Sequence, residues 1–184
     1  MKINYTIFFT LLLLLTSCVD KYDSGKNHPM QQTHDYNLVS DKQDLENSIR
    51  TQSNPDRNNW QKPREVIRLL GDLKGKTVAD IGAGYGYFSF QLLPYAGKVI
   101  AIDIDKSALT QIDSLGKSLR DDLQQKLETR LVGVDNPQLE DEEVDIVFMS
   151  NTYAYIENKV QYLQTVFKGM KPKGRIYIVD FKMK

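Results

Sequence analysis

The chain has 184 residues, of which 41% are apolar and 26% are charged. This composition is typical of one globular domain and excludes a disordered or collagen-like chain. Basic and acidic residues each number 24, so the basic excess of a nucleic-acid-binding domain is absent and we expect no nucleic-acid partner. The one cysteine is Cys18, and both histidines precede Asp35. The main body of the chain therefore has no thiol or imidazole for nucleophilic or general-base catalysis.

Residues 1–17 have the pattern of an export signal. Lys2 supplies a basic start, and residues 7–15 form an apolar run that is too short to cross a bilayer. The Leu-Thr-Ser-Cys segment that ends at Cys18 resembles the lipobox of bacterial lipoproteins. That resemblance implies a lipidated Cys18 and a membrane-anchored protein that faces the periplasm or the cell surface. The alternative is an ordinary signal peptide followed by a cysteine.

The mature chain divides into two parts. Residues 18–59 are polar and carry few apolar side chains, which is typical of a tether that buries too little surface to offset chain ordering. Residues 60–184 have the apolar periodicities of a folded domain.

Strands and helices alternate along this domain. A helix is expected after Pro63, and further helices at residues 87–95, 109–127 and 160–170. Strands are expected at Thr77–Ile81, Lys98–Asp103, Thr129–Val134, Val144–Ser150 and Arg175–Phe181. Continuous apolar strands separated by helices predict an α/β fold, with a doubly wound parallel sheet covered on both faces.

A glycine-rich turn follows the first strand. Asp80 lies at the end of the strand, and Gly82, Gly84 and Gly86 precede the next helix. Alternate glycines allow a tight turn and let a ligand approach the backbone. A dinucleotide fingerprint would require glycine where Tyr87 stands, which disfavours a nicotinamide-dependent oxidoreductase. The D-x-G-x-G-x-G spacing resembles motif I of the class I S-adenosylmethionine-dependent methyltransferases.

A second acidic residue ends the second strand. Asp103 stands where a carboxylate can accept hydrogen bonds from both hydroxyls of a ribose. Its neighbour Asp105 is a second choice for the same role. The alternative is that Asp103 only caps the helix that follows.

The resemblance covers residues 55–181 and includes an R-x-x-W-x-K-P stretch from Arg57 to Pro63. It implies a Rossmann-like sheet and S-adenosyl-L-methionine as cosubstrate. By resemblance the cosubstrate contacts are Asp80 at the methionyl amine, the glycine loop at the methionine part, Asp103 at the ribose, and Asp135 with Asn136 at the adenine. Asn151 and Tyr153 would border the methyl group and the acceptor, with Tyr153 as the catalytic candidate. The alternative for Trp60 and Tyr153 is simple packing.

The implied function is methyl transfer to a small-molecule acceptor. Relatives often carry histidine after the Asn-Thr-Tyr segment, but Ala154 and Tyr155 stand there, so an imidazole base is absent. The alternative is a non-catalytic binding or interaction lipoprotein on the same fold. The sheet of the family continues past strand five, so we expect a sheet truncated after Phe181. Its free edge would be covered by the tether or would pair with another copy of the chain.

Overall fold

A computed structural model describes residues 57–180 of the chain. The predicted signal peptide, Cys18 and nearly all of the predicted tether lie outside these residues, as does Phe181. Among the described helices, none has the length and apolar character needed to cross a membrane.

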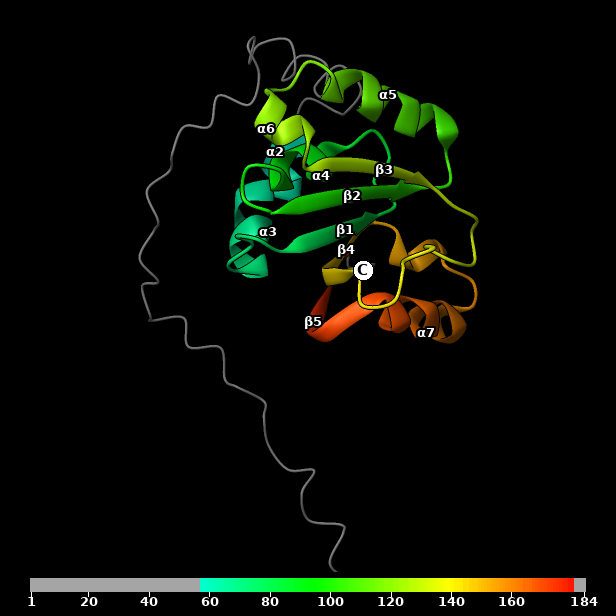
Figure 1. Cartoon of the computed structure of the whole chain (residues 1–184). Helices are drawn as coiled ribbons and strands as arrows, with labels where there is room; N and C mark the ends of the chain where they lie inside the picture. Colours follow the sequence, from blue (N-terminus) through cyan, green and yellow to red (C-terminus); the bar gives the residue numbers. More distant parts are fainter. Residues whose placement is uncertain (1–56, 181–184) are drawn as a thin grey trace, which may run out of the picture. The chain divides into compact units, whose positions relative to one another are not determined.

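The domain is built on one parallel sheet (Figure 1). Its strands are β1 (Thr77–Ile81), β2 (Lys98–Asp103), β3 (Leu127–Leu131), β4 (Val144–Ser150) and β5 (Met170–Val179). Their order in the sheet is β3-β2-β1-β4-β5, and every neighbouring pair is parallel. The predicted fold class, a doubly wound parallel α/β sheet, is therefore confirmed.

Helices precede β1 and follow three of the strands. They are α2 (Arg57–Gln61), α3 (Pro63–Leu70), α4 (Tyr87–Leu92), α5 (Lys106–Gly116), α6 (Asp121–Gln124) and α7 (Lys159–Gly169), with a 3-10 turn η1 at Tyr153–Tyr155. Figure 1 shows α5 beside β2 and β3, and α7 beside β5. No helix lies between β3 and β4 in this part of the chain, where residues 132–143 form a loop.

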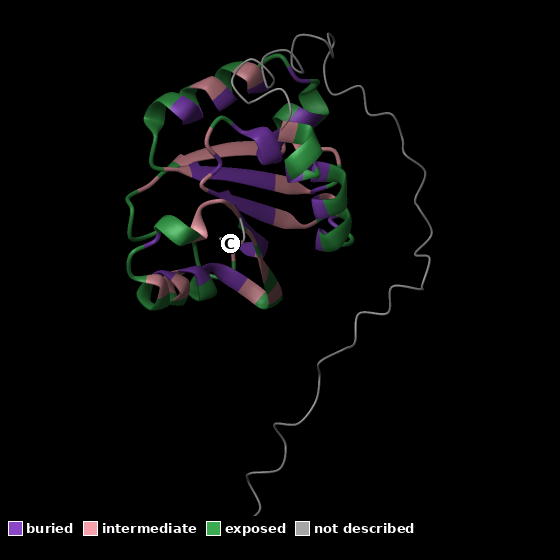
Figure 2. Cartoon of the chain, turned by 180° about the vertical axis from the view of Figure 1, so that it is seen from behind, coloured by how far each residue is buried: buried purple, intermediate pink, exposed green. Residues whose placement is uncertain are grey.

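Successive strand residues point to opposite faces of the sheet, and each face has its own apolar core. Val78 and Phe148 pack with the buried side chains of α3, α4 and α5. Ala79 and Val147 pack on the other face with Val166 of α7. The central strands are buried along most of their length (Figure 2), because helices and loops cover both faces.

Two strands differ from their predicted bounds. The third strand begins at Leu127 and ends at Leu131, before the apolar Val132 and Val134 that had suggested a later strand. The chain leaves β2 at this point, since the amide of Val132 bonds to the carbonyl of Asp103 at 3.1 Å. The fifth strand begins at Met170 because Met170 already pairs with Val144, and the register then shifts before Arg175. Beside β5, residues 57–180 supply no strand other than β4, so pairing of its outer edge with another chain stays a prediction.

Ion pairs cover β3 on the face of the sheet where α7 lies. Glu128 and Arg130 pair in register with Ile100 and Ile102, so they lie on the α7 face of the sheet. The guanidinium of Arg130 donates two hydrogen bonds to Glu143, at 2.7 and 2.8 Å, and also bonds to Glu128. The hydrogen bonds from Arg130 hold the pKa of Glu143 below its ordinary value. These contacts close the face that the loop between β3 and β4 leaves without a helix.

We expect Arg130→Ala to lower the free energy of unfolding by about 2–3 kcal/mol near neutral pH. Fully buried pairs cost ~3–5 kcal/mol when one partner is removed, and this pair is partly exposed. Glu143 has a depressed pKa, so its contribution is present above its ordinary pKa of 4.5 and is lost as the pH falls through the lower folded-state value. Urea unfolding of both proteins should therefore converge in acid.

The matched control is Arg120→Ala, because Arg120 pairs with Asp122 through well exposed side chains. Exposed pairs contribute about 0–1 kcal/mol. An equal loss in the two variants would contradict a special role for Arg130.

Candidate active site at the carboxyl edge of the sheet

Three adjacent strands end together beside the glycine loop. Ile81 of β1 pairs with Ile102 of β2 and with Met149 of β4. Residues that follow these positions, namely Gly82, Asp103 and Ser150, therefore lie at one edge of the sheet. The chain order reverses here, since β2 and β3 lie on one side of β1 while β4 and β5 lie on the other. Such a switch point is where open α/β sheets bind ligands.

The glycine loop is held against β2 by backbone hydrogen bonds. The amides of Gly82 and Ala83 donate to the carbonyl of Ile102 at 2.8 and 3.1 Å. Gly82, Gly84 and Gly86 all have positive φ angles, of 77°, 53° and 83°. L-residues rarely adopt this region, so the loop conformation itself favours glycine at all three positions.

The three glycines differ in what surrounds them. A Cβ at Gly82 would lie 2.1 Å from Oγ1 of Thr152, and one at Gly86 would lie 2.8 Å from the ring of Phe90. A Cβ at Gly84 would meet no described atom within 4 Å. Gly82 and Gly86 are therefore required by packing, whereas Gly84 faces open space that a ligand can occupy.

Asp103 ties the loop to the end of β2. Its Oδ2 accepts a 2.7 Å hydrogen bond from the amide of Gly84, and its Oδ1 accepts one of 2.9 Å from the backbone amide of Asp105. The cap of α5 is Asp105 instead, whose Oδ1 accepts from the amides of Ser107 and Ala108. Asp105, the second choice for ribose binding, therefore serves as the cap. Each carboxylate oxygen of Asp103 has a second lone pair, so both can still accept a hydroxyl.

Asp80 is buried at the end of β1 and is 2% exposed. Its Oδ2 accepts a 2.6 Å hydrogen bond from Ser89 on α4. Burial raises the pKa of Asp80 to about 6, although the bond from Ser89 and the charge of Arg57 act in the opposite direction. The sequence reasoning missed Ser89, for which the available signal was a hydroxyl among the apolar residues of α4.

Because burial disfavours the ionised form of Asp80, we expect Asp80→Asn to stabilise the fold near neutral pH by up to about 3 kcal/mol. Between its ordinary pKa of 3.8 and the folded value near 6, the native state binds more protons than the unfolded state. Wild-type stability should therefore fall as the pH rises through this window, while that of the variant should not. Urea unfolding of both proteins across this range checks the difference, and parallel curves would contradict it.

Helix α2 lies across this edge. The guanidinium of Arg57 lies over the ring of Tyr87, 4.1 Å from its centroid, and the hydroxyl of Tyr87 donates to Asn58 at 2.5 Å. Ser150 donates to Oε1 of Gln61 at 3.3 Å. Within the described part of the chain, Nε of Arg57 and Nε2 of Gln61 are buried without a hydrogen-bond acceptor. Neither residue is predicted from the sequence to have a role in the site, although the R-x-x-W-x-K-P stretch contains both.

The remaining predicted site residues occupy the loops after β3 and β4. Asp135 and Asn136 are exposed, and Asn136 accepts a hydrogen bond from the amide of Gln138 at 2.8 Å. Asn151 has a φ of 55°, and its backbone amide donates to the carbonyl of Val179 at 2.8 Å. Tyr153 is partly buried in η1, where it packs against the apolar core of the α7 face. This contact agrees with the packing alternative for Tyr153, and a catalytic role stays a prediction.

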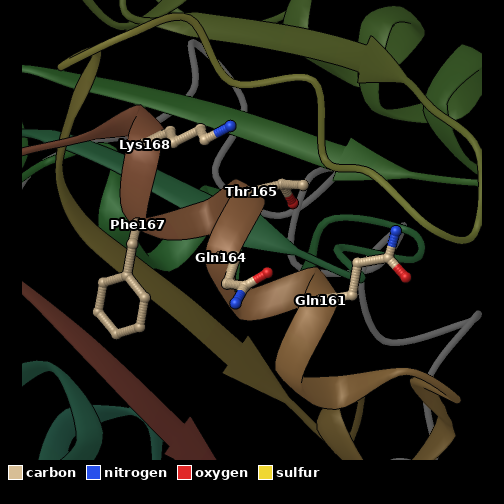
Figure 3. A pocket seen from close by; sticks show the side chains of 5 residues that line it. All are labelled: Gln161, Gln164, Thr165, Phe167 and Lys168. Carbon is tan, nitrogen blue, oxygen red and sulfur yellow. The ribbon is translucent and has the colours of Figure 1, made fainter.

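The described residues present no cluster of three or more ligands that could hold a metal ion. A surface pocket lies on α7 and is lined by Gln161, Gln164, Thr165, Phe167 and Lys168 (Figure 3). It contains no acidic side chain and none of the predicted site residues, so the edge of β1, β2 and β4 remains the functional candidate.

This edge fits a zwitterionic nucleoside such as S-adenosylmethionine. Gly84 offers bare backbone beside open space, and Asp103 has acceptor capacity next to it. Asp80 supplies a buried carboxyl group, and α2 supplies two buried donors without acceptors among residues 57–180. The donors and acceptors therefore match the charged and polar groups that such a ligand carries.

The strand order, the glycine loop and the acid at the end of β2 define a class I methyltransferase domain. Residues 72–184 match the family described as methyltransferase domain, and the chain belongs to this family. A solved S-adenosylmethionine-dependent methyltransferase from Aquifex aeolicus has a TM-score of 0.64 and 26% identity, over 74% of this chain and 72% of that one.

Two curated relatives show similarity over the same domain. Phosphoethanolamine N-methyltransferase 1 from Triticum aestivum is 33% identical over 118 residues, which are 62% of this chain and 23% of that enzyme. A tRNA U34 carboxymethyltransferase from Sulfurimonas denitrificans is 27% identical over 118 residues, which are 63% of this chain and 38% of that enzyme. The chain thus spans less than half the length of either relative.

Proposed function

We propose that the protein transfers a methyl group from S-adenosyl-L-methionine to a small-molecule acceptor. The observation that carries this proposal is the hydrogen bond between Asp103 and Gly84, which joins the glycine loop to the acid at the end of β2, at the switch point of the sheet. Membership of the methyltransferase domain family implies the cosubstrate. The acceptor class rests on the neutral net charge of the chain, which offers no basic excess for nucleic acid.

The bound cosubstrate supplies a methyl group that is already activated by its sulfonium. The protein then has to align donor and acceptor and exclude water, which accounts for a site without cysteine or histidine. We assign Asp103 to the ribose, Asp80 to the methionyl ammonium and Gly84 to close backbone approach. Asp135 and Asn136 would border the adenine, and Asn151 would border the methyl group. An acceptor that needs deprotonation would use Tyr153 or a carboxylate, since no imidazole follows His34.

Incubation of the protein with methyl-labelled S-adenosylmethionine tests this function. The acceptors are the low-molecular-weight filtrate of a bacterial extract and, separately, bulk tRNA. We expect label in the filtrate fraction and its loss with Gly84→Val, which fills the open space at the loop. Label in tRNA alone would overturn the small-molecule acceptor. Binding of the cosubstrate without transfer would favour the non-catalytic alternative.

The predicted export signal at residues 1–17 favours that second function, a binding lipoprotein on the same fold. S-adenosylmethionine is made and used in the cytoplasm, whereas a lipidated Cys18 would place the domain outside it. We therefore propose the lipoprotein anchor as a separate point from the chemistry, because fold alone does not decide function.

We expect Met1 to Ser17 to be removed and Cys18 to carry lipid. Intact-mass analysis of the membrane fraction should show a diacyl or triacyl addition, and Cys18→Ser should abolish it. A protein that begins at Met1 in the soluble fraction would contradict the anchor. It would also strengthen the enzyme proposal, since the cosubstrate is then at hand.

A further inference from the structure

Helix α2 carries two donors that no side chain or backbone group among residues 57–180 satisfies. Arg57 and Gln61 are four residues apart, so their side chains lie on one face of the helix. Gln61 is only 5% exposed, yet its Nε2 has no acceptor among residues 57–180, and neither does Nε of Arg57. Buried donors without acceptors are costly and rare in native folds. Two such donors on one helix face therefore indicate that a bound ligand supplies the acceptor.

The surroundings of these donors indicate where that acceptor lies. Oε1 of Gln61 accepts a hydrogen bond from Ser150, at the end of β4 and next to the glycine loop. Arg57 is held over the ring of Tyr87, the first residue of α4 after the loop. Both side chains are therefore anchored at the candidate edge, with donor atoms left over.

The charges at this edge are complementary to a zwitterion. Arg57 is close enough to Asp80 for each to influence the ionisation of the other. The planar guanidinium is the side chain best suited to a carboxylate, and an ionised Asp80 suits an ammonium group. A free amino-acid group carries both charges on one carbon, so it matches an arginine and an aspartate that lie near each other.

We infer that Arg57 and Gln61 bind the α-carboxylate of the methionyl part of the cosubstrate, opposite Asp80. This inference rests on the proposed function and deepens it, because it makes α2 a clamp for the amino-acid end of the ligand. The same donor chemistry would suit a carboxylate on the acceptor, and the experiment separates these two sources.

The test compares two ligands that differ only in the carboxylate, namely S-adenosylhomocysteine and its decarboxylated analogue. Calorimetric titration of the purified protein should show that the wild type prefers S-adenosylhomocysteine. Arg57→Gln should lower the affinity for S-adenosylhomocysteine by about tenfold or more, while it changes the affinity for the analogue by less than about twofold. Gln61→Leu should show the same selectivity at smaller amplitude.

Two further variants keep the result interpretable. Arg64→Gln on α3 removes an exposed arginine seven residues away and should change neither affinity. Arg57→Lys keeps the positive charge over Tyr87 and loses Nε, so it carries the test if Arg57→Gln does not fold. Only a selective loss for S-adenosylhomocysteine supports the clamp.

Equal weakening of both ligands by Arg57→Gln would overturn the inference, since Arg57 would then act on the fold. If Arg57→Gln changed the affinity for neither ligand, the inference would also be overturned. The two donors would then be assigned to a carboxylate on the methyl-accepting substrate. A wild-type protein that binds neither ligand would refute the proposed function itself, and the clamp with it.

Discussion

Gly82→Ala is expected to lower the free energy of unfolding by about 2–5 kcal/mol, whereas Gly84→Ala is expected to cost only about 1–2 kcal/mol. Both residues have positive φ, so both substitutions carry the strain of a left-handed L-residue, ~1–2 kcal/mol. At Gly82 the new methyl group would also overlap Thr152, with Oγ1 at 2.1 Å and Cβ at 2.8 Å. Overpacking of this kind typically adds ~1–3 kcal/mol. Urea unfolding of the two variants measures the difference directly.

The affinity for S-adenosylhomocysteine should not follow the stabilities of these two glycine variants. Gly84→Ala places a methyl group in the open space beside Asp103, so it should weaken S-adenosylhomocysteine while leaving the fold largely intact. In a double-mutant cycle, Thr152→Ala should recover part of the stability that Gly82→Ala loses, because it removes the two nearest atoms of Thr152. Equal stability of the two glycine variants would contradict the packing argument.

Asp103→Ala is expected to lower the affinity for S-adenosylhomocysteine at least tenfold, and about 100-fold or more if the bonds to both ribose hydroxyls are lost. The variant loses the acceptor proposed for the ribose hydroxyls, and hydrogen bonds to a charged group contribute ~1.5–3 kcal/mol each. It also leaves the amide of Gly84 without its 2.7 Å partner, which loosens the loop.

The matched control is Asp105→Ala, two residues further along the chain. Asp105 caps α5, so its loss should cost about 1 kcal/mol of stability and leave the affinity unchanged. Calorimetric titration and urea unfolding of both variants separate the two roles. An affinity loss in Asp105→Ala but not in Asp103→Ala would reverse the assignment.

Much of the fold follows from local pattern. The bounds of β1, β2 and β4 agree with the prediction because these strands are buried on both faces and read as continuous apolar runs. β3 departs from its predicted bounds because Glu128 and Arg130 are stabilised by ion pairs with Lys98 and Glu143 rather than by burial. Ion-pair partners so far apart in sequence leave no periodic signal.

The candidate site, like the fold, has a part that the sequence predicts and a part that only the structure reveals. The glycine loop and the acid at the end of β2 can be predicted because the required residue types and their spacing are local. The contacts of Arg57 and Gln61 with Tyr87 and Ser150 cannot be, since they join segments up to 89 residues apart. Nothing in the sequence distinguished Asp103 from Asp105 as the cap of α5, and only the hydrogen bonds do so.

The central claim is that the edge of β1, β2 and β4 binds S-adenosylmethionine, and titration of the purified protein with S-adenosylhomocysteine tests it most directly. We predict one bound ligand per chain, no competition from NADH, and an affinity that rises with pH through about 6 as Asp80 ionises to match the ligand ammonium. A folded protein that takes up no S-adenosylhomocysteine at ~1 mM, where even weak complexes form, would contradict the account.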